Sequence, residues 1–377
     1  MKVLSIFPYP ILPLTHGGRV RAYHLAVGLA RAGAEVDLCC PWHPRLPLRS
    51  FEREGITIRP YIFAANALPA VLGDRVIPPL LQLSWQPYTI GPRRLLRRTS
   101  RYDVVEFHFC AHPAWMSRVR GAARIVYMAH NVERDFVAAQ PGLARGHAAQ
   151  RVARLEHRAV RAADLVVTCT AADAARLAEL YGSPKAAAVI SNGFDEHDVR
   201  RADDGERGKL RAELGLAPEE LAVLFVGGRA AHNRQAVRFL EEELLPRISR
   251  PARLLVVGEC APPRRDGRVL ALGHVDELRP LLAAADVAVN PVESGSGSNV
   301  KLAEYLAAGL PVVTTPVGLR GYEDFAHLTT VAELGRFPEA VSHMARPRGL
   351  AQEVGELSWS ALGRRLHGLY TDLLSRT

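Results

Sequence analysis

Short apolar segments alternate with amphipathic ones along the first half of the chain. From the amino terminus onward, the apolar segments are "KVLSIFPYP", "EVDLCCP", "ITIRPYI", "YDVVEFHF", "RIVYMAH", "DLVVTCT" and "AAAVISNG". Segments with helical spacing lie between several of them, and the first, "GGRVRAYHLAVGLARAG", ends at Gly33. Strands that are apolar on both faces and alternate with helices are typical of a parallel sheet covered by helices on both sides.

The alternation restarts after a polar stretch, "DEHDVRRADDGERGKLRAELG", which begins at Asp195 and has little apolar periodicity. The later strands are "LAVLFVGG", "ARLLVVGE", "VLALGHV", "DVAVNPVE" and "PVVTTPVG", and the segments "NRQAVRFLEEELLPRIS" and "WSALGRRLHGLYTDLLS" each predict one helix. We therefore predict an α/β protein with two doubly wound, Rossmann-like parallel-sheet domains that face a cleft. The predicted domains are residues 1–195 and 196–355, followed by a terminal helix in 356–377.

Length and composition agree with this organisation. A chain of 377 residues is long enough for two domains, and its apolar content of 48% is typical of a soluble globular protein. An apolar strand follows Lys2 directly, so we expect no signal peptide. The most apolar stretch, 65–85, is interrupted by Asp74, Arg75 and prolines, so we do not expect it to span a bilayer. The five cysteines lie in or beside apolar strands without a CxxC pair, which predicts buried free thiols. These features favour a cytoplasmic protein.

The net charge of +9 arises from 48 basic and 39 acidic residues, and only four of the basic residues are lysines. Heavy use of arginine and alanine is what a GC-rich genome produces, so part of this charge carries no functional signal. The remainder favours anionic partners such as phosphates, nucleic acid or an acidic membrane surface.

Ligands of doubly wound sheets bind beyond the carboxyl ends of the strands, so the loops at those ends are the candidate sites. In "THGGRVR", Gly17 and Gly18 allow close approach of a ligand to a helix start, although a tight turn without a ligand explains them equally well. In "VGGRAAHNRQAV", Arg229 and Arg234 flank a turn at Gly228, an arrangement that suits a diphosphate. Two surface arginines in an arginine-rich chain are the alternative.

A third loop opens the helix in "GSGSNVKLAEY". Hydroxyls and amides at a helix start are provided by Ser296, Gly297, Ser298 and Asn299. Lys301 follows in the first turn, where a cation opposes the helix dipole unless an anion offsets it. Glu304 is three residues further on, where it can accept hydrogen bonds from sugar hydroxyls or pair with Lys301.

A fourth loop carries His130 and Asn131 directly after a predicted strand, although a lone histidine there is more often structural. Other chemistries lack their motifs. Val300 stands where a dinucleotide fold needs its third glycine, and no P-loop, G-x-S-x-G elbow or zinc-spaced histidine cluster occurs. The sequence therefore excludes an NAD enzyme, a P-loop NTPase and a serine hydrolase.

Together, the segments "GGRVRAYHLAVGLARAGAEV", "AHNVE", "SNGFD", "FVGGRAAHNRQAVRFLEEELLPRI" and "GSGSNVKLAEYLAAGLPVVTTPVGLRG" resemble glycosyltransferase family 4 in their order and spacing. The resemblance extends over nearly the whole chain and implies a retaining enzyme of the GT-B fold that uses a nucleotide sugar. It implies an acceptor-binding domain in 1–195, a donor-binding domain in 196–355, and a terminal helix that packs back toward the first domain.

The resemblance also implies roles for individual residues. Gly17, Gly18 and Gly228 would approach the donor diphosphate, and Arg229 and Arg234 would hold it. The amides of Ser298 and Asn299 would lie near phosphate within the donor loop that runs from Ser296 and Gly297 through Lys301 to Glu304, and Glu304 would bind the ribose hydroxyls. His130 would contact the transferred sugar. We therefore assign His130, Arg229 and Arg234 as catalytic and the others as donor-binding.

One position departs from the family. Its paired glutamates stand eight residues apart, and the residue eight before Glu304 is Ser296, so the donor sugar does not follow from the resemblance. UDP is the first expected nucleotide and GDP the second. Positive groups at the diphosphate would supply most of the stabilisation, and no obligatory metal is expected because Arg229, Arg234 and Lys301 neutralise the phosphates.

The expected acceptor is a hydroxyl compound, either a small molecule or a lipid-linked glycan, bound to the first domain around 18–24. His108, His112 and Trp115 are candidates for lining its pocket, with core packing favoured for Trp115. A basic stretch with Arg93, Arg94, Arg97, Arg98 and Arg101 either contacts an anionic membrane peripherally or forms a solvated helix. Two alternatives to transfer stay open, a non-hydrolysing nucleotide-sugar epimerase and a silent nucleotide-binding subunit. Nucleic-acid binding is not expected, since the basic residues lack interleaved aromatics.

Overall fold

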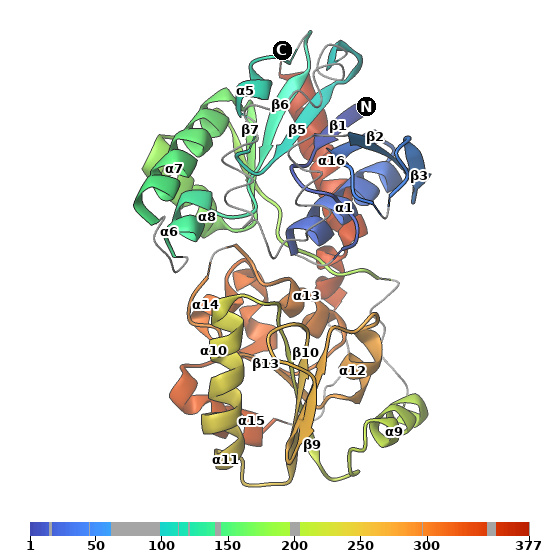
Figure 1. Cartoon of the computed structure of the whole chain (residues 1–377), viewed down its shortest axis with the longest axis vertical. Coiled ribbons are helices and arrows are strands. Elements are labelled where there is room, and N and C mark those ends of the chain that lie inside the picture. The colour runs from blue at the N-terminus through green and yellow to red at the C-terminus, as the bar shows by residue number, and fades with distance from the viewer. Residues whose placement is uncertain are drawn as a thin grey trace. The chain divides into compact units, whose positions relative to one another are not determined.

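The computed structural model describes residues 1–14, 17–44, 46–61, 99–111, 113–119, 121–139, 145–196, 204–295, 297–344 and 352–376. The chain divides into two compact units (Figure 1). Unit 1 comprises Met1–Ser191 and Trp359–Thr377, and unit 2 comprises Asn192–Ser358. The carboxy-terminal helix therefore belongs to the amino-terminal unit. No helix within the described ranges is long and apolar enough to cross a membrane.

Unit 1 is built on one sheet with the strand order β3-β4-β2-β1-β5-β6-β7-β8. All neighbouring strands in it are parallel except the β3–β4 pair. The strands are β1 Lys2–Ile6, β2 Glu35–Pro41, β3 Phe51–Arg53, β4 Ile56–Tyr61, β5 Val104–His108, β6 Arg124–Met128, β7 Leu165–Thr168 and β8 Ala187–Val189. The helices are α1 Gly17–Arg31, a 3₁₀ turn at Thr99–Arg101, α5 Pro113–Met116, α6 Glu133–Ala138, α7 Arg145–Ala162, α8 Ala171–Tyr181 and α16 Trp359–Ser375.

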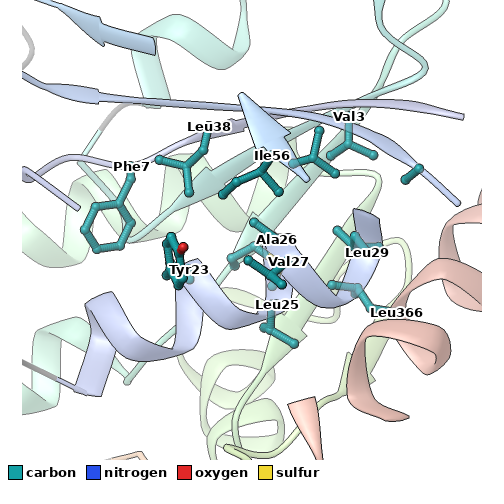
Figure 2. Packing of buried hydrophobic residues seen from close by; sticks show 14 of the residues in the cluster. Val3, Phe7, Tyr23, Leu25, Ala26, Val27, Leu29, Leu38, Ile56 and Leu366 are labelled. Atoms are coloured by element: carbon teal, nitrogen blue, oxygen red, sulfur yellow. The ribbon is translucent and has the colours of Figure 1, made fainter. Parts of the chain in front are cut away.

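One core of unit 1 lies between the sheet and the helices α1 and α16. Figure 2 shows side chains of α1, among them Tyr23 and Val27, packed beneath residues of the strands such as Leu38, with Leu366 of α16 beside them. The two helices touch backbone to backbone. A Cβ atom added at Gly28 would lie 2.6 Å from the carbonyl oxygen of Trp359 and 2.9 Å from the Cα atom of Gly363. Glycine at this crossing therefore permits α16 to join unit 1.

Unit 2 is built on a second sheet with the order β11-β12-β10-β9-β13-β14-β15, in which only the β11–β12 pair is antiparallel. Its strands are β9 Leu221–Val226, β10 Ala252–Val257, β11 Arg264–Asp266, β12 Val269–Gly273, β13 Val287–Asn290, β14 Val312–Thr314 and β15 Thr329–Val331. Its α-helices are α9 Asp204–Glu213, α10 Ala231–Phe239, α11 Leu245–Arg247, α12 Arg279–Ala284, α13 Val300–Ala307, α14 Pro316–Leu319 and α15 Phe337–Ser342. A π-helical segment spans Leu240–Leu244, and 3₁₀ segments span Glu323–Leu328, Leu334–Arg336 and Gln352–Leu357.

The predicted doubly wound α/β class is confirmed in both units, with three differences of detail. The antiparallel edge strands β3 and β11 and the short strand β15 were not predicted, because their residues, FER, RRD and TTV, are mostly polar and form no apolar run. The predicted single helix from Asn233 onward is divided by the π-helical segment. The five cysteines are buried, as predicted.

The polar stretch expected to be a boundary contains helix α9. This helix is attached by arginines in addition to Leu210, which packs against the core of unit 2. Arg207 and Arg211 donate to the two carboxylate oxygens of Asp286 at 2.6 and 2.9 Å, and both also donate to backbone carbonyls of the α12 region. Hydrophobic periodicity misses a helix that is held by buried ion pairs.

Candidate functional site

The strand order of unit 2 reverses between β9 and β13, which lie side by side in the sheet. Chain order runs outward from β9 through β10 and β12 on one side, and from β13 through β14 and β15 on the other. Loops at such a reversal diverge and leave a ligand site at the carboxyl ends of the strands. Two of the four predicted loops, the one after β9 and the one after β13, lie at this point.

The loop after β9 is a glycine turn at Gly227 and Gly228. A Cβ atom added at Gly227 would lie 3.0 Å from the Phe225 ring and 3.1 Å from the side chain of Asn233, so little space is left there. A Cβ at Gly228 would meet no atom within 4 Å, so this residue faces open space. Asn233 closes the turn, because its Nδ2 donates to the carbonyl oxygen of Gly228 at 3.2 Å.

The same asparagine connects the turn to helix α13. Lys301 Nζ donates to Asn233 Oδ1 at 3.1 Å and lies 4.4 Å from the centroid of the Phe225 ring. The predicted residues Gly228 and Lys301 are therefore brought together through Asn233, which the sequence analysis did not identify. The available signal was an asparagine in the first turn of a helix, where its propensity is low.

Lys301 is strongly perturbed by its position. Burial lowers its pKa to about 7, and the nearby Cys260 and Glu304 oppose this effect only in part. Lys301 also lies in the first turn of α13, whose dipole disfavours a cation. The same surroundings lower the pKa of His232 through burial and through the charges of Lys301 and Arg320. Two cations, Lys301 and Arg320, thus act on His232 at this end of the sheet.

The loop before α13 turns through left-handed glycines, Gly295 with φ 128° and Gly297 with φ 70°. Arg320 holds this loop, because its Nε donates to the carbonyl oxygen of Gly297 at 2.9 Å. Asn192 donates from Nδ2 to Ser298 Oγ at 2.8 Å. Neither Arg320 nor Asn192 was predicted to support the donor loop.

Asn299 is the residue that precedes helix α13, but its side chain does not cap the helix. Its Nδ2 instead donates to the carbonyl oxygen of Gly318 at 3.1 Å. The Asn299 side chain therefore leaves the first turn of α13 uncapped, although the backbone N–H of Leu302 donates to the Asn299 carbonyl oxygen at 3.0 Å. The predicted donor residue Ser296 lies outside the described residues.

The two predicted arginines extend from the glycine turn and are exposed. Arg229, with 54% of its side chain exposed, forms an ion pair with Glu259, which follows strand β10. Arg234 donates to the backbone carbonyl of Arg229. Both guanidinium groups are thus on the same turn as Gly228, and Arg229 is held by a carboxylate that a stronger anion could replace.

In unit 1 the strand order reverses between β1 and β5, and the other two predicted loops lie there and after β6. A Cβ atom added at Gly18 would lie 2.9 Å from Phe109 Cζ and 3.6 Å from His130 Nδ1. The ring of His130 stacks on Phe109 with centroids 4.2 Å apart. The structure therefore brings Gly18 and His130 together, while Gly17 is an exposed residue at the start of α1.

His130 is only 6% exposed, and burial together with the charges of His108 and Arg21 holds its pKa well below the ordinary value. His108 is corrected as a pocket-lining candidate, since it is 1% exposed and lies in the interior, whereas Trp115, at 3% exposure, packs in the core as favoured from the sequence. His112 and the arginines 93, 94, 97 and 98 lie outside the described residues, and Arg101 is exposed. No group of three histidine, cysteine or carboxylate side chains in the described part of the chain could hold a metal ion.

Comparison with known proteins places these loops in a family. The family model described as "Glycosyltransferase Family 4" matches residues 15–198, and the one described as "Glycosyl transferases group 1" matches residues 220–344. A D-inositol 3-phosphate glycosyltransferase from Nocardia farcinica is 30% identical over 84% of this chain and 74% of its own length.

Solved structures agree in fold. Sucrose-phosphate synthase from Thermosynechococcus elongatus is 18% identical and aligns over the whole of both chains with a TM-score of 0.76. Anabaena HepE in complex with UDP and glucose is 15% identical, covers 100% of this chain and 96% of its own, and has a TM-score of 0.64. These likenesses show the GT-B fold. The chain belongs to glycosyltransferase family 4, and it is an enzyme of the glycosyltransferase class.

Proposed function

We propose that the chain transfers a sugar from a nucleoside diphosphate sugar to a hydroxyl acceptor with retention of configuration, and that unit 2 binds the donor diphosphate. The observation that carries this proposal is the position of Lys301 in the first turn of α13. Its amine is largely buried, and a hydrogen bond to Asn233 of α10 holds it beside the glycine turn. An amine in this position is costly in the empty protein. A bound anion removes the cost by restoring a counter-charge.

The surrounding groups suit a diphosphate. Gly228 leaves open space on the turn, the side chain of Asn299 does not cap α13, and Arg229 and Arg234 extend from the same turn. Charge develops on the leaving diphosphate during transfer, so these groups would stabilise the transition state more than the bound donor. Glu304, one turn along α13 from Lys301, is the proposed partner of the ribose hydroxyls.

UDP is the proposed nucleotide, supported by the HepE structure, whose title names UDP and glucose. The proposed transfer needs no metal, because three basic side chains replace it at the diphosphate. In unit 1, His130 beside Gly18 is the proposed contact to the transferred sugar. D-inositol 3-phosphate is the first acceptor to test, since it appears in the names of several relatives.

The binding test is a thermal-shift and calorimetric panel of UDP, GDP, dTDP and their common sugars. A nucleotide at about 100 times its Kd should add about 2.7 kcal/mol to the stability of the chain. Arg234→Ala should lose this stabilisation, while Arg238→Ala, an exposed arginine one turn further along α10, should keep it. Stabilisation by no nucleotide, or equal stabilisation of both variants, contradicts the proposed donor site.

The activity test follows the products of the stabilising donor with and without acceptor. Transfer predicts a new glycoside only when acceptor is present, with the anomeric configuration of the donor retained by NMR. A changed sugar without acceptor indicates an epimerase, and binding without turnover indicates a silent subunit. Activity that is lost on chelation and restored by a divalent ion contradicts the metal-free part of the proposal.

A further inference from the structure

A chain of buried polar side chains leads from the carboxy-terminal helix to His130. Tyr370 of α16 donates its hydroxyl proton to Glu106 Oε1, and Glu106 Oε2 lies 3.4 Å from His108 Nε2. The same His108 nitrogen is 2.8 Å from Ser5 Oγ, and His108 Nδ1 is 3.0 Å from His130 Nε2. The other ring nitrogen of His130, Nδ1, is buried and has no hydrogen-bond partner among the described residues.

The sheet itself sets this alignment. Glu106 and His108 are two residues apart on β5, so they point to the same face, and Ser5 of β1 is the register partner of Glu106. Helix α16 covers that face and places Tyr370 against the carboxylate. Glu106 is 2% exposed and His108 is 1% exposed, so neither side chain is hydrated by bulk water. A carboxylate and an imidazole in a hydrophobic interior require a stronger reason than packing.

The order of donors and acceptors follows from the carboxylate. A carboxylate oxygen accepts hydrogen bonds, and so can the hydroxyl oxygen of Ser5, so these two neighbours of His108 Nε2 favour a proton on that nitrogen. His108 Nδ1 is then an acceptor, and the hydrogen bond to His130 requires the proton to be on His130 Nε2. We propose that Glu106, acting through His108, fixes His130 in the Nε2–H tautomer and so presents His130 Nδ1 as a hydrogen-bond acceptor to a hydroxyl of the transferred sugar.

The surroundings of His130 make its tautomer decisive. Burial and the neighbouring charges hold its pKa low, so the ring is neutral and carries one proton. Stacking on Phe109 fixes the ring plane, and Nδ1 faces the position where Gly18 has no side chain. A hydroxyl that reaches Nδ1 meets a lone pair in one tautomer and an N–H in the other. Glu106 and His108 are thus positioning residues that act through His130.

This inference rests on the proposed function for the identity of the hydroxyl, but not for the tautomer. The tautomer can be tested on the protein without substrates. ¹⁵N-histidine NMR distinguishes protonated from unprotonated ring nitrogens, and the His130 signals are assigned by their loss in His130→Gln. We expect His130 Nε2 protonated and Nδ1 unprotonated in the wild-type protein. Protonation of Nδ1 overturns the proposal, and this result requires no variant of Glu106.

Glu106→Gln tests the direction of the polar contacts that lead from Glu106 through His108 to His130, which we call the relay. The carboxamide has the same shape, but its NH₂ group can donate to His108 Nε2. The proton of the His108 ring is then on Nδ1, which donates to His130 Nε2 and leaves the His130 proton on Nδ1. We expect this reversal in the NMR spectrum and a fall in kcat of at least about 10²-fold, in line with the loss caused by the wrong histidine tautomer in a serine protease triad. The Kd of the nucleotide alone should stay unchanged, because the diphosphate binds unit 2.

Glu133→Gln is the matched control, since Glu133 is another buried carboxyl group of unit 1. It should leave the His130 signals as in the wild type. A Glu106→Gln protein with wild-type His130 signals and wild-type kcat overturns the relay. A reversed spectrum in a chain that binds no nucleotide supports the relay and contradicts the proposed function, so the two failures are distinguishable.

Discussion

Replacement of Lys301 by methionine should stabilise the empty protein while it abolishes the proposed donor site. Methionine keeps the length and the apolar stem of lysine but removes the charge. In the folded chain this amine is largely buried at a helix amino terminus, and its only described hydrogen bond is to Asn233. Its pKa falls from an ordinary value of 10.5 to about 7 because burial disfavours the charged form.

The upper limit of the gain follows from that difference. At about 1.4 kcal/mol per pH unit, the interval between 10.5 and about 7 corresponds to about 5 kcal/mol. Part of Lys301 remains in contact with water, so the realised gain is smaller, about 1–2 kcal/mol. The unfolded chain binds the extra proton between pH 7 and pH 10.5, so this contribution makes the wild type more stable as the pH rises through that interval.

The assay is denaturation of the wild type and Lys301→Met at a pH below 7 and again as the pH approaches 10.5. The variant should melt higher below pH 7, by about 2–4 °C per kcal/mol, and the advantage should disappear toward pH 10.5. Lys209→Met, an exposed lysine of α9 in the same unit, is the control and should show no such pattern. A variant that is less stable below pH 7, or equally more stable at both pH values, refutes the reasoning.

The same variant should bind the nucleotide about 10- to 100-fold more weakly, the usual cost of losing a hydrogen bond to a charged group. Wild-type binding above pH 7 should be accompanied by proton uptake, because a bound diphosphate raises the pKa of Lys301. Calorimetry in buffers with different ionisation enthalpies measures that uptake. Nucleotide binding without proton uptake, and with equal affinity in the variant, would place the diphosphate elsewhere.

Three other perturbations test separate parts of the structure. Burial and the nearby Glu156 raise the pKa of Glu133 from 4.5 to about 8. Between these pH values the folded chain holds a proton that the unfolded chain has lost, so the stability of the protein should fall as the pH rises through this interval. Chemical denaturation of Glu133→Gln should show a smaller dependence of stability on pH. Gly363→Ala places a methyl group against the backbone of Gly28 and should lower the free energy of unfolding by about 1–3 kcal/mol, measured by denaturant titration, whereas Gly368→Ala, where a Cβ meets no atom within 4 Å, should not. Glu259→Gln releases Arg229 from its ion pair and should tighten UDP binding about two- to fivefold, because an exposed ion pair contributes up to about 1 kcal/mol. Calorimetry measures this change in affinity. An unchanged affinity would show that Arg229 does not reach the nucleotide.

The sequence predicted the elements whose hydrophobic pattern is long enough to have a period. Apolar strands such as Val104–His108 and the long helices were found, because burial on a helix-covered sheet imposes that pattern. Helix α9 was missed because its attachment depends on Arg207 and Arg211, which a hydrophobicity pattern counts as solvent-exposed. The edge strands β3 and β11 were missed because their residues, FER and RRD, are mostly polar.

The sequence also indicated which loops carry candidate site residues, but not which residues hold them in place. Glycines and cations at strand ends marked Gly228, Lys301 and His130, since strand ends of a doubly wound sheet are where ligands bind. The residues that hold them were not predictable. Asn233 depends on a contact between two segments that are far apart in the sequence, and Glu106 lies inside a strand between the apolar residues Val105 and Phe107.

Both candidate sites contain a buried polar group that costs stability when no ligand is bound, and a bound ligand can remove this cost. Among the described residues, the largely buried amine of Lys301 in unit 2 forms no ion pair, and the buried Nδ1 of His130 in unit 1 has no hydrogen-bond partner. Each costs stability in the empty chain, by about 1–3 kcal/mol for an unsatisfied buried polar group. Each is fixed by a second buried polar residue, Asn233 or His108, so neither can relax into another partner. A ligand that supplies the missing partner recovers that free energy on binding, which is why the same positions that destabilise the protein are those where a nucleotide sugar should stabilise it.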